Sequence, residues 1–507
     1  MRKKLFFLIP SIGEIIFIIT FLTLSFSISM VLLRDSDTGW HIRIGEFILD
    51  NFSIPRFDIF SYVAPPLPWI TPDWLSELSM ALIHQTLGLN GVAIFFAFII
   101  SLLYYLLFRI IRQQKGNIIF DVLIILIVMI SSMFHWLARP YIFSLLLFLA
   151  SYYILERFQR NGKNYLYFLP PIMLLWTNLH GAFITGFILE GIYLFCNMVT
   201  FFFSREAKRE EYKKKTKILG LTTLVCVLTS LINPFGYNVF FYTFNVTSNQ
   251  YLMNNITEFL PPNFRYPLMM PFKYLLLIVI TTLALTRKKL EFHELLLILL
   301  FTAMSLYAVR NILFFAIVVA PILSRHSNLI INQLNGKFVN FLRKRSENIT
   351  RVDASARAFI WVFPLILMAA IVMGYRLRIR FDEKKKPVAA VEFLKREFIK
   401  GNMFNNDEFG DYIIYSAYPK YKVFIHDKID WRAEEKLKEY IKVTKFEEGW
   451  EDIIKKYEIN WIIFDTDSML SRFLKERKDW KLIYTDKVAS IFVRNVPENF
   501  DLIKKYP

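Results

Sequence analysis

The sequence predicts a polytopic α-helical membrane protein with a soluble α/β domain at its C-terminal end. Three observations lead to this prediction: the chain is 55% hydrophobic, its apolar residues come in long blocks, and the blocks stop near residue 375. The blocks are roughly 17–25 residues long, which is the length that a helix needs to cross a bilayer core. We therefore expect a transmembrane domain over residues 1–375 and a soluble domain over residues 376–507.

About eleven apolar blocks are candidates for membrane spans. The first follows the basic residues Arg2, Lys3 and Lys4 and is too long for a cleaved signal peptide, so we expect it to be retained as a span. The blocks lie near residues 5–33, 88–108, 118–136, 141–155, 165–177, 181–203, 218–232, 271–286, 295–309, 311–323 and 358–375.

The basic residues between the blocks predict the topology. The connecting segments on one side of the membrane hold 26 Lys and Arg, whereas the segments on the other side hold seven. Because cytoplasmic loops carry the excess of Lys and Arg, we expect a cytoplasmic N-terminus and an extracytoplasmic C-terminal domain in a multi-pass plasma membrane protein. The net charge of +18 is explained in this way. No nucleic-acid-binding motif accompanies it, so we expect the bilayer and no nucleic acid as a partner.

Six predicted outer loops carry polar and aromatic side chains close to the membrane boundary. Polar groups at membrane depth are costly and are usually paired or functional, so their gathering on one face predicts one site. The alternative is that Trp, His and Asn only decorate the interface, as aromatic belts do. The residues are Asp35, Asp37, Trp40 and His41 in the first loop, followed by His135, Arg139, Asn178, His180, Asn233, Asn255, Glu258 and Arg310.

The C-terminal residues have the composition of a soluble domain. Residues 376–507 hold 28 Lys and Arg against 24 Asp and Glu, and helical and strand patterns alternate along them, which is typical of a small α/β domain. No GxGxxG motif or P-loop supports nucleotide binding. Asp427 and Asp430 follow a strand pattern and are either a site or ordinary loop carboxylates. We expect helices at 387–400, 408–418, 432–457 and 467–478, and strands at 402–405, 422–426, 461–465, 480–485 and 489–494, the last two as a hairpin.

The order of residues in the first outer loop resembles that of a known group. It runs Asp35, Asp37, Thr38, Gly39, Trp40, His41, Gly45, Glu46, Ile54, Pro55, Asp58, Phe60, Ser61, Pro68 and Trp69. Further matches are 138–140, 175–181, 233–236, 258–262, 310–311, 401–412 and 422–427. The chain resembles bacterial polytopic membrane proteins related to the GT-C glycosyltransferases, which include protein O-mannosyltransferases and oligosaccharyltransferases. The resemblance covers nearly the whole chain and implies a GT-C-like membrane domain.

The resemblance implies a membrane glycosyltransferase. Such an enzyme would move a sugar from a polyprenyl-phosphate-linked donor to a glycan, lipid or protein acceptor at the extracytoplasmic face. In GT-C enzymes an acidic residue of the first outer loop serves as base or metal ligand, and here that role falls on Asp37 or Asp35. The family usually continues with Asp-Gly-Arg where this chain has His426, Asp427 and Lys428, so no role is carried over there.

The chemistry of this reaction assigns expected roles to the loop residues. Arg139, Arg310 and His180 would hold the phosphate by charge-assisted hydrogen bonds. Asp37 is the first choice for the general base and Asp35 the second. Glu258 would assist the base or orient the acceptor, and the other expected substrate-binding residues are Trp40, His41 and Asn178. No cofactor is required by the sequence, but Asp35 and Asp37 together could hold a divalent cation such as Mg²⁺ or Mn²⁺.

Each assignment has an alternative. Arg139 and Arg310 could extend to the interface or pair with Glu258, His180 could bond a helix end, and Trp40 could be an interfacial anchor. At the level of function, the alternatives are a lipid or glycan transporter or flippase, and a non-catalytic envelope assembly protein. A transporter predicts internal repeats and polar groups near mid-membrane, whereas here the polar groups gather at one face.

Overall fold

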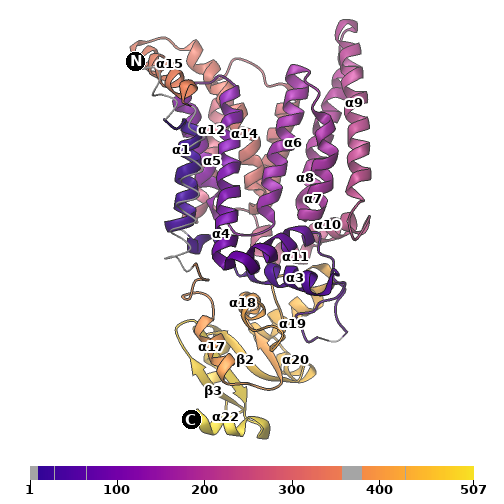
Figure 1. The fold of residues 1–507 in the computed structure, drawn as a ribbon, viewed down its shortest axis with the longest axis vertical. Coiled ribbons are helices and arrows are strands. Elements are labelled where there is room, and N and C mark those ends of the chain that lie inside the picture. The colour runs from indigo at the N-terminus through magenta and orange to yellow at the C-terminus, as the bar shows by residue number, and fades with distance from the viewer. Residues whose placement is uncertain (1–8, 28, 64, 357–378, 429, 507) are drawn as a thin grey trace. The chain divides into compact units, whose positions relative to one another are not determined.

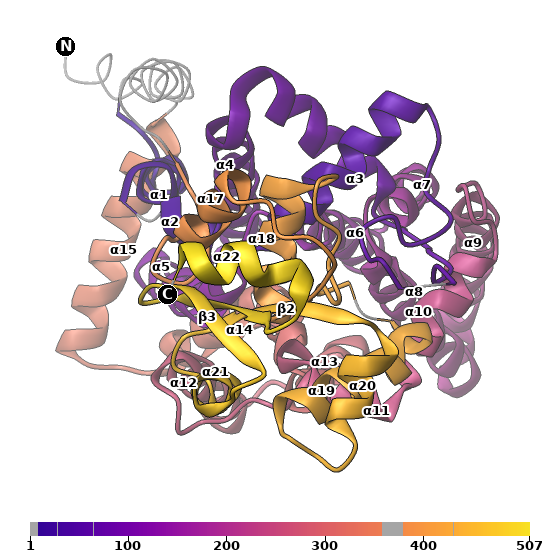
Figure 2. The same ribbon diagram turned by 90° about the horizontal axis from the view of Figure 1, so that it is seen from below.

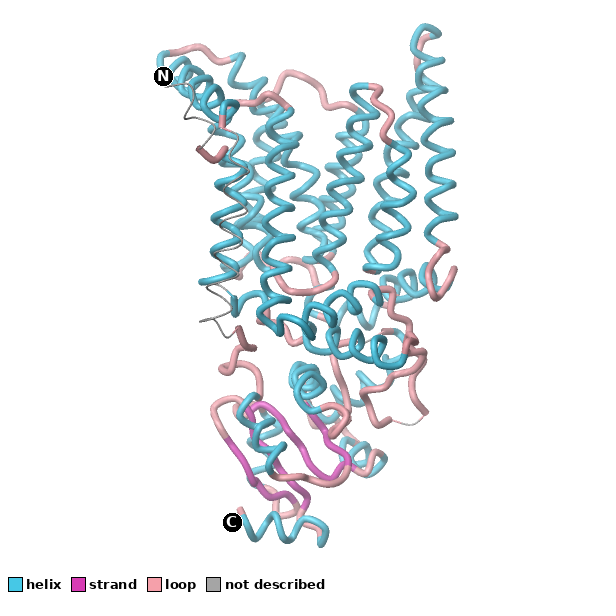
Figure 3. The backbone as a smooth tube through the Cα atoms, in the orientation of Figure 1, coloured by secondary structure: helices cyan, strands magenta, loops and turns pink. Residues whose placement is uncertain are grey.

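The computed structural model of residues 1–507 describes every residue except 1–8, 28, 64, 357–378, 429 and 507. Most of its elements are helices, and the described strands form one sheet near the C-terminal end (Figure 3). The chain divides into two compact units. Unit 1 comprises Met1–Ser29, Ala93–Thr243 and Met253–Arg378, and unit 2 comprises Met30–Val92, Phe244–Leu252 and Ile379–Pro507.

Unit 1 is a bundle of helices, most of them apolar, several of which run alongside one another in Figure 1. Its helix α14 packs against α5, α6, α12 and α13, and the run of side chains from Ile312 to Ser324 is buried, as expected for a helix that is apolar all round. The helices are α1 (Ile12–Leu22), the second half of α4 (Trp74–Gln113), α5 (Ile118–Ser132), α6 (Tyr141–Asn161), α7 (Leu169–Leu179), α8 (Ile184–Phe203), α9 (Glu206–Ser230), the first half of α10 (Asn238–Ser248), α12 (Met270–Leu285), α13 (Phe292–Tyr307), α14 (Ile312–Gln333) and α15 (Lys337–Ser355).

Apolar helices are present where most of the membrane spans are predicted. In the described part of the chain, six helical segments are long and apolar enough to cross a membrane: Trp74–Gln113, Ile118–His135, Tyr141–Asn161, Gly181–Phe203, Pro267–Leu285 and Val309–Gln333. Three shorter apolar segments coincide with further predicted spans: Ile12–Phe26, Leu166–Leu179 and Phe292–Tyr307. The block 358–375 lies outside the described residues. The count of eleven spans therefore stays a prediction.

Unit 2 combines helix α3 (Asp37–Asn51) and the start of α4 with the C-terminal α/β fold. The strand order is β1-β2-β4-β3, with β1 parallel to β2 and the other pairs antiparallel. Helices α17, α20, α21 and α22 pack against this sheet (Figure 2). The elements are α17 (Val388–Arg396), β1 (Asn402–Asn405), α18 (Asp407–Ala417), α19 (Glu434–Thr444), α20 (Trp450–Lys456), β2 (Ile459–Asp465), α21 (Met469–Glu476), β3 (Trp480–Thr485), β4 (Ala489–Arg494) and α22 (Phe500–Lys505).

Most of the predicted C-terminal elements are present, but the strand predicted at 422–426 is not. The backbone of this segment is hydrogen-bonded by the side-chain amide of Asn405 instead of by a neighbouring strand of the sheet. The Nδ2 of Asn405 donates to the carbonyl of Ile425 at 2.8 Å, and its Oδ1 accepts from the backbone N–H of Phe424 at 2.8 Å. Because these backbone groups are satisfied by a side chain, the apolar segment stays buried without joining the sheet.

The single helix predicted at 432–457 is two helices. Helix α19 ends at Thr444, and α20 begins at Trp450. Two residues between them have left-handed backbones, Phe446 with φ 56° and Gly449 with φ 79°. A right-handed helix cannot continue through such residues. The helix is therefore interrupted, although the amphipathic periodicity of the sequence continues.

Residues 30–92 belong to unit 2, together with the C-terminal residues. Helix α3 packs closely on α18. The approach is so close that a Cβ on Gly39 would lie 2.7 Å from the Cβ of Tyr415. The Nε of Arg43 donates to the carbonyl of Tyr415 at 2.8 Å. The predicted soluble domain thus contains the whole sheet, and the structure adds part of the predicted first outer loop to its core. The boundary at residue 375 stays a prediction.

We expect the substitution Gly410→Ala to destabilise unit 2. A Cβ at this position of α18 would lie 2.2 Å from the carbonyl oxygen of Ile425, so the loop carrying Ile425 would have to move. Overpacking of this kind costs about 1–3 kcal/mol. Thermal unfolding should show a lower midpoint for this variant. Gly191→Ala is the matched control, since a Cβ at Gly191 in α8 meets nothing within 4 Å; an equal loss in both variants would contradict the explanation.

Candidate functional site

Four carboxylates of unit 2 form what we call the acidic cluster: Asp35, Asp37, Asp411 and Asp427. Asp35, Asp37 and Asp427 each offer one oxygen atom, and these oxygens all lie within 4.8 Å of one another. Asp411 is fully buried behind them, and its Oδ1 accepts from the backbone N–H of Asp427 at 3.1 Å. Two segments that are distant in sequence therefore place their carboxylates together.

The start of α3 and the close approach of α18 position the cluster. Asp37 is the first residue of α3, where the helix dipole favours a negative charge, and its backbone N–H donates to Oδ1 of Asp35 at 3.1 Å. Gly410 in α18 lets the carbonyl of Ile425 approach, and this contact brings the loop with Asp427 next to Asp411.

Burial and mutual repulsion raise the pKa values of two members. Burial raises the pKa of Asp411 well above its usual range, and the charge of Asp37 raises it further. Burial likewise raises the pKa of Asp427 well above its usual range, followed by the charges of Asp411 and Asp37. A site that gathers carboxylates in this way favours positive charge, either as protons or as a bound cation.

One buried lysine compensates part of this charge. Lys386 is 2% exposed, and its Nζ donates to Oγ of Ser36 at 3.2 Å and to Oε2 of Glu408 at 2.9 Å. Ser36 in turn donates to the carbonyl of Glu408 at 2.8 Å. Burial works to lower the pKa of Lys386, but Glu408 outweighs it, with contributions from Asp35 and Asp411, so the pKa is raised. The lysine is therefore a fixed cation behind the cluster.

Trp40 and His41 support the cluster from within α3. The indole N–H of Trp40 donates to Oδ1 of Asp37 at 3.4 Å, and both Trp40 and His41 are buried. The Nδ1 of His41 lies 3.1 Å from Oε1 of Glu77, whose other oxygen accepts from the hydroxyl of Thr71 at 2.8 Å. These contacts give Trp40 and His41 positioning roles, and their predicted substrate contacts stay predictions.

Unit 1 contains a second group, which we call the basic cluster: Arg139, Arg310 and Glu258. Both guanidinium groups lie 3.5 Å from the Glu258 carboxylate, Arg139 at Oε2 and Arg310 at Oε1. Burial works to raise the pKa of Glu258, but the charges of Arg310 and Arg139 outweigh it and lower the pKa to about 2. Two cations share one anion, so the cluster keeps a surplus of positive charge.

Aromatic rings and short helices hold the basic cluster. Arg310 is in the 3-10 helix η9 (Val309–Asn311), and its guanidinium lies 4.8 Å from the centroid of Phe259 and 5.7 Å from that of Tyr141. The hydroxyl of Tyr141 donates to the carbonyl of Arg310 at 2.5 Å. The backbone N–H of Val309 donates to the carbonyl of Leu260 at 3.0 Å, which ties η9 to the segment that carries Glu258.

His180 and Asn178, at the end of α7, make bonds that organise helix ends. The Nδ1 of His180 accepts from the backbone N–H of Ala182 at 3.1 Å and lies 2.9 Å from the hydroxyl oxygen of Ser144. The Nδ2 of Asn178 donates to the carbonyl of Ile232 at 3.0 Å, which follows α9. The helix-end alternative for His180 therefore matches its contacts, and the predicted roles of both residues in substrate binding stay predictions.

The predicted site residues thus fall into two groups. The acidic cluster with Trp40 and His41 belongs to unit 2, and the basic cluster with His180 and Asn178 belongs to unit 1. The alternative that both arginines pair with Glu258 is present in the structure. Sequence reasoning did not single out Asp411, although it lies within the matched segment 401–412, and it left Asp427 between a site and an ordinary loop residue.

Of the comparisons with known proteins, the comparison with solved structures bears on the fold. No protein-family model matches the chain, and no curated protein matches it in sequence. Among solved structures, it is similar to the archaeal oligosaccharyltransferase AglB from Archaeoglobus fulgidus, determined in complex with an inhibitory peptide and a dolichol-phosphate. The TM-score is 0.53 at 11% identity, covering 96% of this chain and 74% of that chain. The chain therefore resembles this oligosaccharyltransferase in fold, and its described part has helices that are long and apolar enough to cross a membrane.

Proposed function

We propose that the protein is a membrane glycosyltransferase that moves a sugar from a polyprenyl-phosphate-linked donor to an acceptor at the extracytoplasmic face. The observation that carries the proposal is the acidic cluster at the start of α3, on a fold shared with an oligosaccharyltransferase. The solved relative was determined with a dolichol-phosphate and a peptide, which supports a lipid-linked donor and a separate acceptor here.

We assign the acceptor to the acidic cluster. In the reaction, the acceptor oxygen forms a bond to the anomeric carbon of the sugar while the bond from that carbon to the phosphate oxygen breaks. The acceptor hydroxyl loses its proton, and Asp37 is the carboxylate assigned to take it, with Asp35 beside it. The hydrogen bond from Trp40 fixes the orientation of Asp37, so the carboxylate is held for this task.

We assign the leaving phosphate to the basic cluster. Arg139 and Arg310 carry more positive charge than Glu258 neutralises, and guanidinium groups bind phosphate oxygens through paired hydrogen bonds. A carboxylate with a pKa of about 2 is a weak base at neutral pH. Glu258 therefore serves better as the group that holds the two arginines than as the catalytic base.

The acidic cluster also fits a divalent cation. Carboxylate oxygens are the ligands that Mg²⁺ and Mn²⁺ prefer, and, as the alternative to Asp37 acting as the base, Asp35, Asp37 and Asp427 would hold the ion. The raised pKa values of Asp411 and Asp427 record a repulsion that such an ion would relieve. When bound, the ion would supply positive charge that offsets the charge of the leaving phosphate.

We expect Asp37→Asn to lower the transfer rate by at least about a hundredfold, because an amide cannot accept the proton. Asp35→Asn should also reduce it. The measurement is release or transfer of labelled sugar from a polyprenyl-phosphate donor by the full-length protein in nanodiscs. Asp50→Asn, an exposed position at the other end of α3, is the matched control and should keep the wild-type rate. Wild-type rates in both Asp37→Asn and Asp35→Asn would falsify the catalytic assignment.

We expect Mn²⁺ to bind the purified protein saturably, as measured by electron paramagnetic resonance, and to raise its unfolding temperature. Asp427→Asn should weaken Mn²⁺ affinity by roughly tenfold or more, since fewer anionic ligands remain. Asp467→Asn changes an exposed carboxylate of unit 2 and should bind as the wild type does. Equal affinity in the two variants would remove Asp427 from the ligand set.

We expect Glu258 to make the stability of unit 1 depend on acid pH. Its pKa in the folded protein, about 2, lies below the ordinary value of about 4.3, so the folded state binds fewer protons. Its contribution is therefore present above about pH 4.3 and is lost as the pH falls toward 2. Unfolding midpoints from about pH 6 to about pH 3 should fall less steeply for Glu258→Gln than for the wild type. The exposed Glu347→Gln should follow the wild-type curve, and a wild-type slope in Glu258→Gln would contradict the ion pairing.

A further inference from the structure

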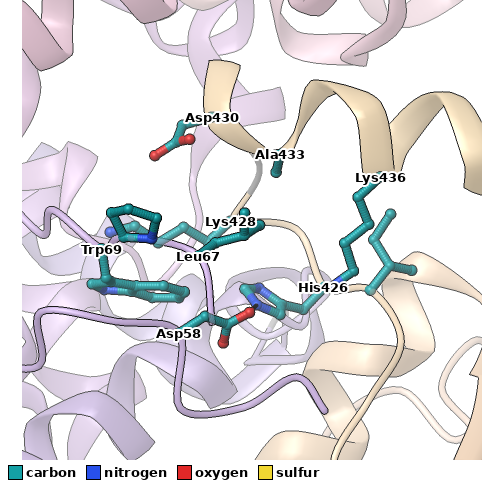
Figure 4. Close-up of a pocket in the computed structure, with 10 residues that line it drawn as sticks. Asp58, Leu67, Trp69, His426, Lys428, Asp430, Ala433 and Lys436 are labelled. Carbon is teal, nitrogen blue, oxygen red and sulfur yellow. Dashed lines mark hydrogen bonds and ion pairs between the residues drawn. The ribbon is translucent and has the colours of Figure 1, made fainter. Parts of the chain in front are cut away.

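A hollow of unit 2 is lined by Asp58 and residues 67–69 on one side and by residues from 425–428 and 430–436 on the other. It has a volume of about 430 Å³ including its open mouth, and the polar side chains that line it are Asp58, Trp69, His426, Lys428, Asp430 and Lys436 (Figure 4). Leu67, Pro68 and Ile425 supply apolar wall. Only about 30 Å³ of this space is enclosed, which is room for one or two water-sized groups such as the oxygens of a single anionic group, with the rest of a ligand at the open mouth.

Nitrogens of described residues around this hollow lack hydrogen-bond partners, and two of them, Trp69 Nε1 and Lys428 Nζ, can only donate. Of the residues that the structure describes, Trp69 Nε1, His426 Nδ1 and Lys428 Nζ are buried atoms without a hydrogen-bond partner. The Lys428 ammonium lies 4.9 Å from the ring centroid of Trp69 and 5.3 Å from that of Trp40, and Figure 4 shows it beside the Trp69 ring. Buried donors without acceptors are costly, so a ligand that brings acceptors is favoured.

The carboxylates around the hollow already have hydrogen-bond partners. Asp58 accepts from the hydroxyl of Ser61 at 2.5 Å and from two backbone N–H groups, and it faces His426 Nε2 at 3.5 Å. Asp430 accepts from the backbone and the guanidinium of Arg432. Glu77, which interacts electrostatically with Lys428, is within hydrogen-bond distance of Thr71 and His41. No carboxylate among these is left over for the unpartnered donors.

A second lysine adds positive charge to the hollow. Lys436 of α19 is 8% exposed and reaches toward Asp58 in Figure 4. Burial lowers the pKa of Lys436 to about 8 and Asp58 offsets only part of that effect. The ring of Phe424 lies 5.6 Å from its ammonium group. An incoming anion would supply the charge that this site lacks.

We propose that this hollow binds an oxyanion, the carboxylate of a uronic acid or the phosphate of a sugar phosphate, carried by an acidic glycan acceptor. The lining of the hollow supports oxyanion binding. The assignment of this oxyanion to the glycan acceptor rests on the proposed transferase function. His426 and Lys428 flank Asp427 in the chain, so one loop supplies both the hollow and the acidic cluster. An acidic unit held in the hollow would thereby orient a neighbouring hydroxyl of the acceptor toward the cluster.

The test is calorimetric titration of full-length protein, in nanodiscs of neutral lipid, with glucuronate, glucose 1-phosphate and glucose. We expect saturable binding of at least one of the two anions and weaker binding of glucose. Lys428→Met and Lys436→Met should each weaken anion binding by roughly ten- to hundredfold, and Trp69→Phe, which removes the indole N–H together with the five-membered ring, by roughly two- to tenfold. The preferred anion distinguishes a carboxylate from a phosphate source.

Controls separate this site from the rest of the molecule. Lys475→Met removes an exposed lysine of α21 and should bind as the wild type does. Arg310→Gln changes an arginine of the basic cluster, and this variant should keep the anion-binding component that is lost in Lys428→Met. Thermal unfolding identifies a variant that has failed to fold, and Trp69→Phe then carries the test because it keeps a six-membered aromatic ring in place of the indole. Equal binding of glucose and the anions, or unchanged anion affinity in Lys428→Met and Trp69→Phe, would overturn the proposal.

The two proposals fail in different ways. If the oxyanion site is wrong, anion affinity is insensitive to the hollow variants while Asp37→Asn still abolishes transfer. If the transferase function is wrong, no sugar transfer responds to Asp37→Asn, while anion affinity still depends on Lys428 and Lys436.

Discussion

Mutual repulsion between carboxylates is the interaction on which the arrangement of unit 2 depends. Asp35, Asp37 and Asp427 lie within a few ångströms of one another, and Asp411 is buried behind them. Such a group is stable only where fixed positive charge and N–H dipoles surround it. Lys386, the first turn of α3 and the backbone N–H of Asp427 supply these. The close packing of α3 on α18 therefore works against the preference of like charges to separate.

The two clusters have opposite imbalances of charge. Unit 2 gathers carboxylates in excess, and unit 1 gathers guanidinium groups around the single carboxylate of Glu258. Sugar transfer from a lipid phosphate makes both demands, because a proton must leave the acceptor and negative charge must be held on the phosphate. The imbalance in each cluster therefore matches one of the two demands of the proposed reaction.

The sequence predicted what depends on local pattern. Apolar blocks gave the helices of unit 1, and alternating patterns gave four strands of the sheet. The strand at 422–426 was mispredicted because an amide from Asn405 satisfies that backbone, a contact with no signal in the segment itself. The same limit applies to the site. Asp35 and Asp37 were singled out by their position directly after the first span and by the family resemblance, whereas Asp411 joins them through the approach of Gly410 to Ile425, which neither segment reveals alone.

The composition of unit 2 affects how the protein is made. Its first part, Met30–Val92, leaves the ribosome long before Ile379–Pro507, and at about 5–20 residues per second the wait is roughly 15–60 seconds. During that time α3 has no α18 to cover it, and Asp35 and Asp37 have neither Asp411 nor Asp427. A chain that stops early, or is cleaved before Ile379, would carry complete helices in its membrane bundle and half of an acidic cluster. Completion of synthesis therefore acts as the event that assembles the cluster.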